Sequence, residues 1–212
     1  MARWEADPGA ARRDMLAAIA GAVRDGELRA AMVAQVNLAG LVADHESVGA
    51  GVRALGDAIA FAEAHGLPAE EVRAARVAKL VFAGEWSEVI READDLLPWA
   101  RSSGDAFMEV RIRLASAHVR LERGEAIGEQ ADFAKLARDT GWCPLQIAPV
   151  VAGAAVEAGD GAGARRLLAD ALDIAYPGAL FGFVWFDRAC LRAGALDLAR
   201  RAVRVGTGRV SA

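Results

Sequence analysis

A short turn recurs along the chain every 35 to 40 residues, and this spacing constrains the fold more than any other feature. Glycine marks the turn in "FAGEW", "ERGEA", "EAGDG" and "RAGAL", at Gly84, Gly124, Gly159 and Gly194, and Glu46 holds the corresponding place in "ADHES". Helix-compatible segments flank every marker, so each interval contains two helices. A period of this length is typical of stacked helical hairpins. The sequence therefore predicts an all-α protein.

Equivalent positions in these intervals share chemistry. The residue nine positions after each marker is apolar: Leu55, Ala93, Phe133, Leu168 and Val203. The residue five positions after it is mostly small: Gly51, Val89, Glu129, Ala164 and Ala199. Antiparallel helices approach closely only where one presents a small side chain to a larger one. We therefore expect these positions to lie where the helices of a hairpin meet.

The turn signals divide the chain into a helix map. Asp7 before Pro8 predicts an N-cap and a first helix that begins there. Pro98 predicts a kink or an end in its own helix, and no segment alternates as a strand does. The predicted hairpins pair 28–44 with 47–65, 69–83 with 85–102, 106–123 with 126–140, 144–158 with 161–175, and 179–193 with 195–205.

This map predicts three parts of the chain. Residues 1–26 form an N-terminal helix, 27–206 a repeat domain, and 207–212 a flexible tail. The N-terminal helix is either the second half of a repeat that lacks its first half or an ordinary capping helix, since terminal repeats are commonly atypical.

Composition limits the class of partner. The chain has 25 basic and 29 acidic residues and a net charge of −4, without the basic patch typical of nucleic-acid binding. The longest strongly apolar run, Gly178–Phe186, is too short to cross a bilayer, and Met1–Pro8 lacks the apolar segment of a signal peptide. Two cysteines without a CxxC spacing fit a reducing compartment. We expect a cytoplasmic protein that binds neither nucleic acid nor membrane.

No residue pattern predicts catalysis, a metal or a cofactor. The histidines, His45, His65 and His118, have no partner at metal-ligand spacing, and we interpret them as surface or helix-capping residues. Carboxylate pairs such as Glu122 with Glu125 are expected on solvated faces. The glycine-rich "AGDGAGARR" lacks the Lys-Ser/Thr ending of a phosphate loop and follows a helix, so we interpret it as a repeat turn.

The small residues of the intervals resemble those of the tetratricopeptide repeat. Ala39, Ala117 and Ala152 match the family's small residue in the first helix, and Ala164 and Ala199 its alanine in the second. The resemblance covers about Glu27 to Val205. It implies a right-handed α-α superhelix of about five helical hairpins behind the N-terminal helix.

The resemblance also implies a concave groove lined by the first helix of each repeat. This lining is largely apolar and would suit an apolar helix or another part of the same polypeptide, although a core within the chain would look the same. The family's groove positions correspond here to Val36, Ala43, Ala74, Ala78, Val81, Leu114, His118, Gln146, Gly153, Val184 and Arg188.

The irregular repeats are similar in style to the C-terminal solenoids of bacterial signalling ATPases, class III adenylyl cyclases and ATPase-linked transcription regulators. That similarity implies a non-enzymatic scaffold or regulatory domain that binds a protein or peptide. One alternative is a solenoid that senses a ligand or peptide near Phe181–Phe186 and Cys143; a weaker one is an enzyme. Self-association through one solenoid end would give a homodimer.

Overall fold

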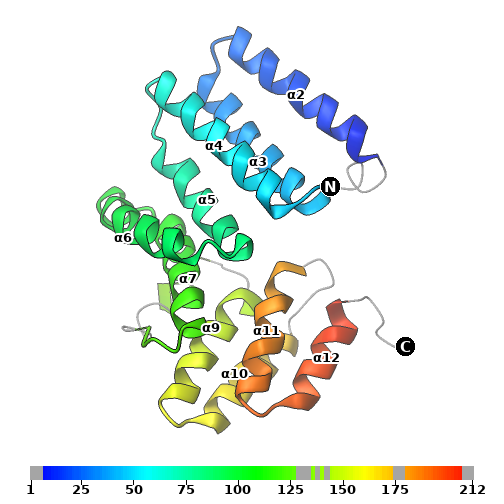
Figure 1. The fold of residues 1–212 in the computed structure, drawn as a ribbon, viewed down its shortest axis with the longest axis vertical. Helices are drawn as coiled ribbons and strands as arrows, with labels where there is room; N and C mark the ends of the chain where they lie inside the picture. Colours follow the sequence, from blue (N-terminus) through cyan, green and yellow to red (C-terminus); the bar gives the residue numbers. More distant parts are fainter. Residues whose placement is uncertain (1–6, 128–134, 137–138, 141–143, 174–179, 207–212) are drawn as a thin grey trace. The chain divides into compact units, whose positions relative to one another are not determined.

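In the computed structural model, the described residues are 7–127, 135–136, 139–140, 144–173 and 180–206. Within these ranges the regular structure consists of ten α-helices, without a strand (Figure 1). The chain divides into two compact units, Met1–Ser103 and Gly104–Ala212, which are described separately. This division falls inside the repeat domain predicted for residues 27–206.

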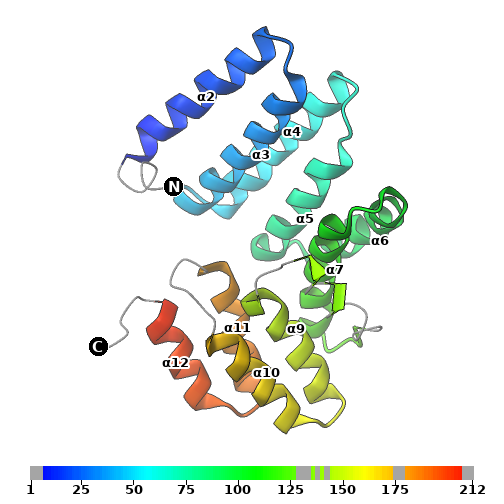
Figure 2. The same cartoon turned by 180° about the vertical axis from the view of Figure 1, so that it is seen from behind.

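The first unit places each helix against the next one in the chain. Two views from opposite sides show α3 next to both α2 and α4, and α5 beyond α4 (Figures 1 and 2). The helices are α2 (Pro8–Arg24), α3 (Leu28–His45), α4 (Val48–Ala64), α5 (Glu70–Ala83) and α6 (Trp86–Ser103).

The second unit is organised around α9. This helix packs against α7, α10 and α11, and α11 in turn packs against α12. The helices are α7 (Ala106–Glu122), α9 (Pro144–Glu157), α10 (Gly161–Asp173), α11 (Leu180–Arg192) and α12 (Leu196–Gly206). The predicted helix over 126–140 lies mostly outside the described residues.

Left-handed glycines form the turns that the sequence spacing predicted. Gly84, Gly124, Gly159 and Gly194 have φ between 65° and 81°. At Gly84 the next residue, Glu85, donates its backbone N–H to the carbonyl of Leu80 at 3.1 Å, which closes the end of α5 in a Schellman motif. Because a residue with a Cβ atom rarely adopts this φ, glycine recurs at these places.

Close approach of α3 and α4 explains a glycine inside a helix. A Cβ atom on Gly51 would lie 2.4 Å from the Cβ of Ala43 and 2.9 Å from the carbonyl oxygen of Ala39. The prediction that small residues mark close helix contacts is confirmed at this position.

The start of α2 is confirmed, whereas an end at Pro98 is wrong. The Asp7 carboxylate accepts a hydrogen bond from the Ala10 N–H at 2.9 Å, and Pro8 is the first helical residue. In α6 the helix continues through Pro98 to Ser103. Pro98 is exposed, while Leu96 and Ala100 on either side of it are buried, so packing keeps the helix intact past the proline.

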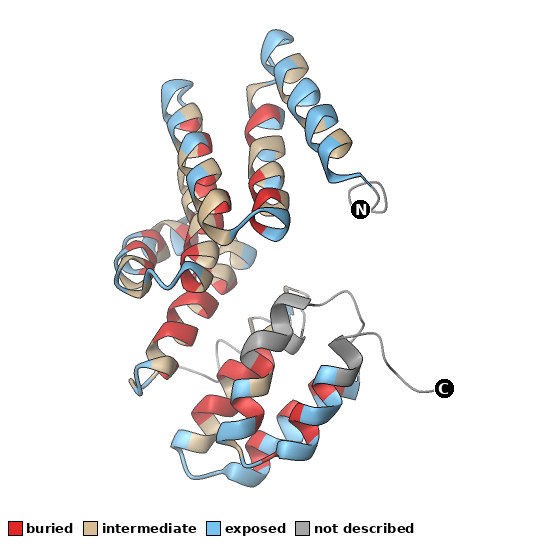
Figure 3. Cartoon of the chain, turned by 45° about the vertical axis from the view of Figure 1, so that its right-hand side comes forward, coloured by how far each residue is buried: buried red, intermediate tan, exposed pale blue. Residues whose placement is uncertain are grey.

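Burial follows one side of most helices, as the colours in Figure 3 show. In contrast, α2 has no buried residue, and Leu16 and Val23 on it are exposed. This helix packs on α3 and is otherwise open to solvent in the first unit.

Candidate interaction surface

Two of the large apolar side chains that are exposed in the described part of the second unit lie on α12. Leu196 and Val203 are 50% and 53% exposed, and they lie seven residues apart, so they share one side of α12. Arg200 is exposed between them, four residues after Leu196. We call Leu196, Arg200 and Val203 the α12 face.

The other sides of α12 are occupied by contacts within the unit. Asp197 and Arg201 form ion pairs with Arg165 and Asp173 of α10, at 2.6 Å and 2.7 Å. The hydrogen bond from Arg165 lowers the pKa of the Asp197 carboxyl. Ala202 is fully buried in the core that α12 shares with α10 and α11. The α12 face is therefore distinct from both the core side and the side that holds α10.

The described residues at the positions equivalent to Val203 in earlier intervals are buried. Leu55, Ala93 and Leu168, which hold the position of Val203 in earlier intervals, are at most 2% exposed. Phe133, the remaining equivalent, lies outside the described residues. The apolar position that is covered in three earlier helices is thus open in α12.

A polar cluster joins α7 to α11 in the same unit. The Glu122 carboxylate lies 2.8 Å from Arg188 Nη1 and 3.1 Å from Arg192 Nη2. Its side chain is only 11% exposed, so the expectation of a solvated Glu122 is wrong. Two guanidinium groups, one turn apart on α11, replace the water that a surface carboxylate would bind.

His118, one turn before Glu122 on α7, is buried. Burial, with a smaller effect from the charge of Arg192, lowers its pKa to about 3. The expectation of a surface or capping histidine is therefore wrong for His118, because α7 is covered on the side that carries it. It is confirmed for His65, whose Nδ1 lies 2.9 Å from the carbonyl oxygen of Phe61.

Asp187 and Cys190 lie one turn apart on α11. Asp187 Oδ1 is buried without a hydrogen-bond partner among the described residues, and burial raises the pKa of this carboxyl. Burial, followed by the nearby charge of Asp187, raises the pKa of the Cys190 thiol to about 12. The thiol is therefore held in its protonated and poorly nucleophilic form.

Most of the residues predicted to line a groove are buried or partly buried within their own unit. In the first unit Ala43, Ala74 and Val81 are buried and Val36 and Ala78 are partly buried; in the second, Leu114, His118 and Gly153 are buried, Gln146 is partly buried and Arg188 is exposed. The side chain of Val184 lies outside the described residues. Partner binding at these positions stays a prediction.

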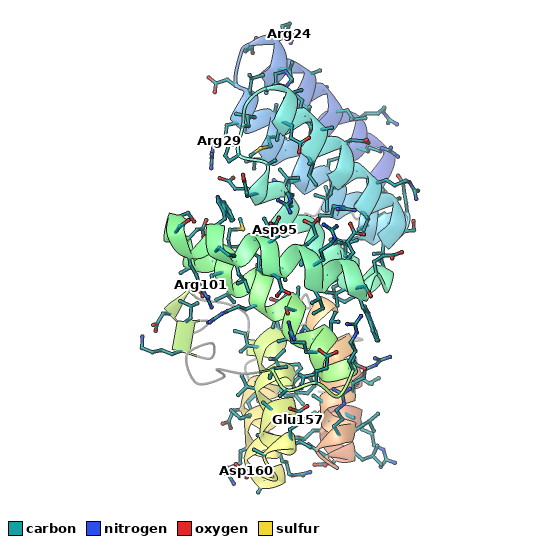
Figure 4. The ribbon with its side chains drawn as sticks, turned by 60° about the vertical axis from the view of Figure 1, so that its left-hand side comes forward. Arg24, Arg29, Asp95, Arg101, Glu157 and Asp160 are labelled. Atoms are coloured by element: carbon teal, nitrogen blue, oxygen red, sulfur yellow. The ribbon has the colours of Figure 1, made fainter. Side chains whose placement is uncertain are left out.

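Charged side chains in the first unit tie helices together. Arg73 on α5 donates from Nε to Glu92 at 3.0 Å and also pairs with Asp95 of α6, whose side chain is labelled in Figure 4. In the second unit Asp160, in the turn before α10, accepts a hydrogen bond from the Gly163 N–H at 2.7 Å (Figure 4). Arg73 and Asp160 therefore have their polar partners within the chain, where these contacts hold α5 against α6 and cap the start of α10.

Among the described side chains, no group of three or more His, Cys, Asp or Glu residues could hold a metal ion. None of the described helices combines the length and apolarity needed to cross a membrane. Comparison of the chain with protein-family models, with curated proteins and with solved structures finds no match.

Proposed function

We propose that this chain is a tetratricopeptide-like helical repeat module that binds another protein and catalyses no reaction itself. A role as a scaffold or regulatory domain in bacterial cytoplasmic signalling follows from the resemblance of its repeats to solenoids of that kind. Successive packing of helices joined by short glycine turns supports the repeat assignment.

The observation that carries the proposal is the exposure of the α12 face. Val203 is 53% exposed at a position where Leu55 and Leu168 are almost fully buried. Covering a leucine or valine side chain contributes about 1.5–3 kcal/mol. In a stack of hairpins the next hairpin provides this cover, and a partner helix can provide it equally.

Two buried titratable groups of the second unit, His118 and Cys190, support a non-catalytic role. A general acid or base works best with a pKa near the working pH. The pKa of His118 is about 3 and that of Cys190 about 12, so both groups keep one protonation state near neutral pH.

Crosslinking in the cells that express the protein tests this proposal. We expect a partner that is captured by the wild-type chain and lost when Leu196 and Val203 are both changed to serine. A matched control changes Leu167, an exposed leucine of α10, to serine and should keep the partner. A chain that captures no protein, or the same proteins after the α12 substitutions, would contradict the proposal.

A further inference from the structure

Two glycine turns of the second unit, at Gly159 and Gly194, set a register between α10 and α12. Six residues after Gly159 and Gly194 come Arg165 and Arg200. Nine residues after the same glycines come Leu168 and Val203. The α12 face therefore repeats the arginine and the apolar side chain that α10 carries at these places.

In α10 both of these side chains, Arg165 and Leu168, contact the hairpin that follows, which consists of α11 and α12. Arg165 donates from Nη1 and Nη2 to the two carboxylate oxygens of Asp197 on α12, at 2.8 Å and 2.6 Å. This fork-to-fork geometry fixes the position of a carboxylate as well as attracting it. Leu168 is fully buried in the core that includes Phe186 and Cys190 of α11.

On α12 the same two groups face solvent. Arg200 is exposed and forms no ion pair with any described residue, and Val203 is 53% exposed. Leu196 adds a second apolar side chain one turn before Arg200. The face thus combines an apolar ridge with a guanidinium whose equivalent in α10 binds a carboxylate.

We propose that the α12 face binds a helix of a partner protein that carries apolar side chains along one side and a carboxylate opposite Arg200. This inference rests on the proposed protein-binding function and specifies its partner. The partner helix takes the place that α12 itself takes on α10, with its carboxylate in the role of Asp197.

Charge argues against a second copy of the chain as the occupant. An isologous contact between two α12 faces places Leu196 against Val203 of the other copy and brings the two Arg200 side chains together at the two-fold axis. Two guanidinium groups at that point repel each other, whereas an acidic helix neutralises Arg200.

A peptide taken from the chain itself provides the probe. Residues 180–206 contain α11, α12 and Asp197, the carboxylate that Arg165 binds. A fluorescent synthetic peptide of this sequence is titrated with the full-length protein, and anisotropy reports binding. We expect saturable binding that weakens about fivefold in Arg200→Glu and at least about tenfold when Leu196 and Val203 are both serine.

Charge exchange makes the test specific for Arg200. A peptide with Asp197→Arg should bind the Arg200→Glu protein more tightly than the unchanged peptide does. The matched control protein is Arg166→Glu, which reverses an exposed arginine of α10 and should leave the affinity within about twofold. Absence of saturable binding up to about 1 mM, or equal binding to wild-type and Arg200→Glu proteins, overturns the inference.

Sedimentation of the protein alone completes the experiment. A concentration-dependent dimer that disappears when Leu196 and Val203 are serine assigns the face to a second copy and overturns the acidic-helix inference. If cellular crosslinking captures a partner that depends on Leu196 and Val203 but not on Arg200, the protein-binding function stands and this inference alone fails.

Discussion

Arg192 on α11 and Glu122 on α7 form a 3.1 Å ion pair across 70 residues of sequence, and Arg188 holds the same carboxylate at 2.8 Å. The Glu122 side chain is nearly buried, while both arginines are partly exposed. These ion pairs therefore link α7 to α11, two helices of the second unit that are far apart in the sequence.

Replacement of Glu122 by glutamine should destabilise the protein by about 1–2 kcal/mol. Two guanidinium groups then lose their carboxylate, although their partial exposure lets water replace part of the interaction. Urea unfolding followed by circular dichroism measures the change. Glu125→Gln, at a partly exposed carboxylate that lies 3.6 Å from Arg120 and 3.9 Å from Arg123, should cost less than about 0.5 kcal/mol. Equal losses in the two variants would contradict the role of Glu122.

Two glycines in α4 should respond to alanine with opposite signs. At Gly51 a new Cβ would lie 2.4 Å from that of Ala43, so Gly51→Ala should destabilise the protein by about 1–3 kcal/mol. At Gly56 no described atom other than its chain neighbours and its own helix backbone lies within 4 Å of a new Cβ, and Gly56→Ala should stabilise the helix by about 0.5–1 kcal/mol. Thermal unfolding of both variants measures the signs, and a neutral Gly51→Ala would rule out the close contact.

Much of the helix map could be predicted because its signals are local. A glycine such as Gly84, with φ of 79°, ends a helix through its own backbone, and Asp7 starts one through its own side chain. At Pro98 the local signals disagreed, because the proline predicted a kink or an end while the helix map continued to residue 102. The helix continues to Ser103, and buried neighbours such as Leu96 hold both of its halves in place.

The candidate surface and the polar cluster depend on distant contacts. Neither Glu122 nor His118 shows in its neighbouring sequence that its side chain will be largely removed from solvent. Val203 matches Leu168 in its repeat position, yet only the stacking of hairpins decides which of the two is exposed. The arginine repeated at positions 165 and 200 was visible in the sequence, but its meaning required the ion pair with Asp197.

Acid should destabilise the second unit through His118. Its pKa of about 3 in the folded protein lies below the ordinary value of 6.5, so the unfolded chain takes up the proton first. Stability from this group is complete above about pH 6.5 and falls as the pH drops toward 3, by about 2 kcal/mol between pH 7 and pH 5. Urea midpoints across this range should fall less steeply in His118→Gln than in wild type, whereas His45→Gln, at an exposed histidine, should keep the wild-type slope.

Cys190 should be unreactive in the folded protein. Its thiol is buried and its pKa is raised to about 12, so little thiolate is present near neutral pH. In a Cys143→Ser background, which leaves Cys190 as the one thiol of the chain, modification by a chromogenic disulfide at pH 8 should be at least about 100-fold slower in buffer than in concentrated urea. The rate in buffer then reports opening of the core between α10, α11 and α12. Rapid stoichiometric modification without urea would show that Cys190 is accessible and that this core does not close over it.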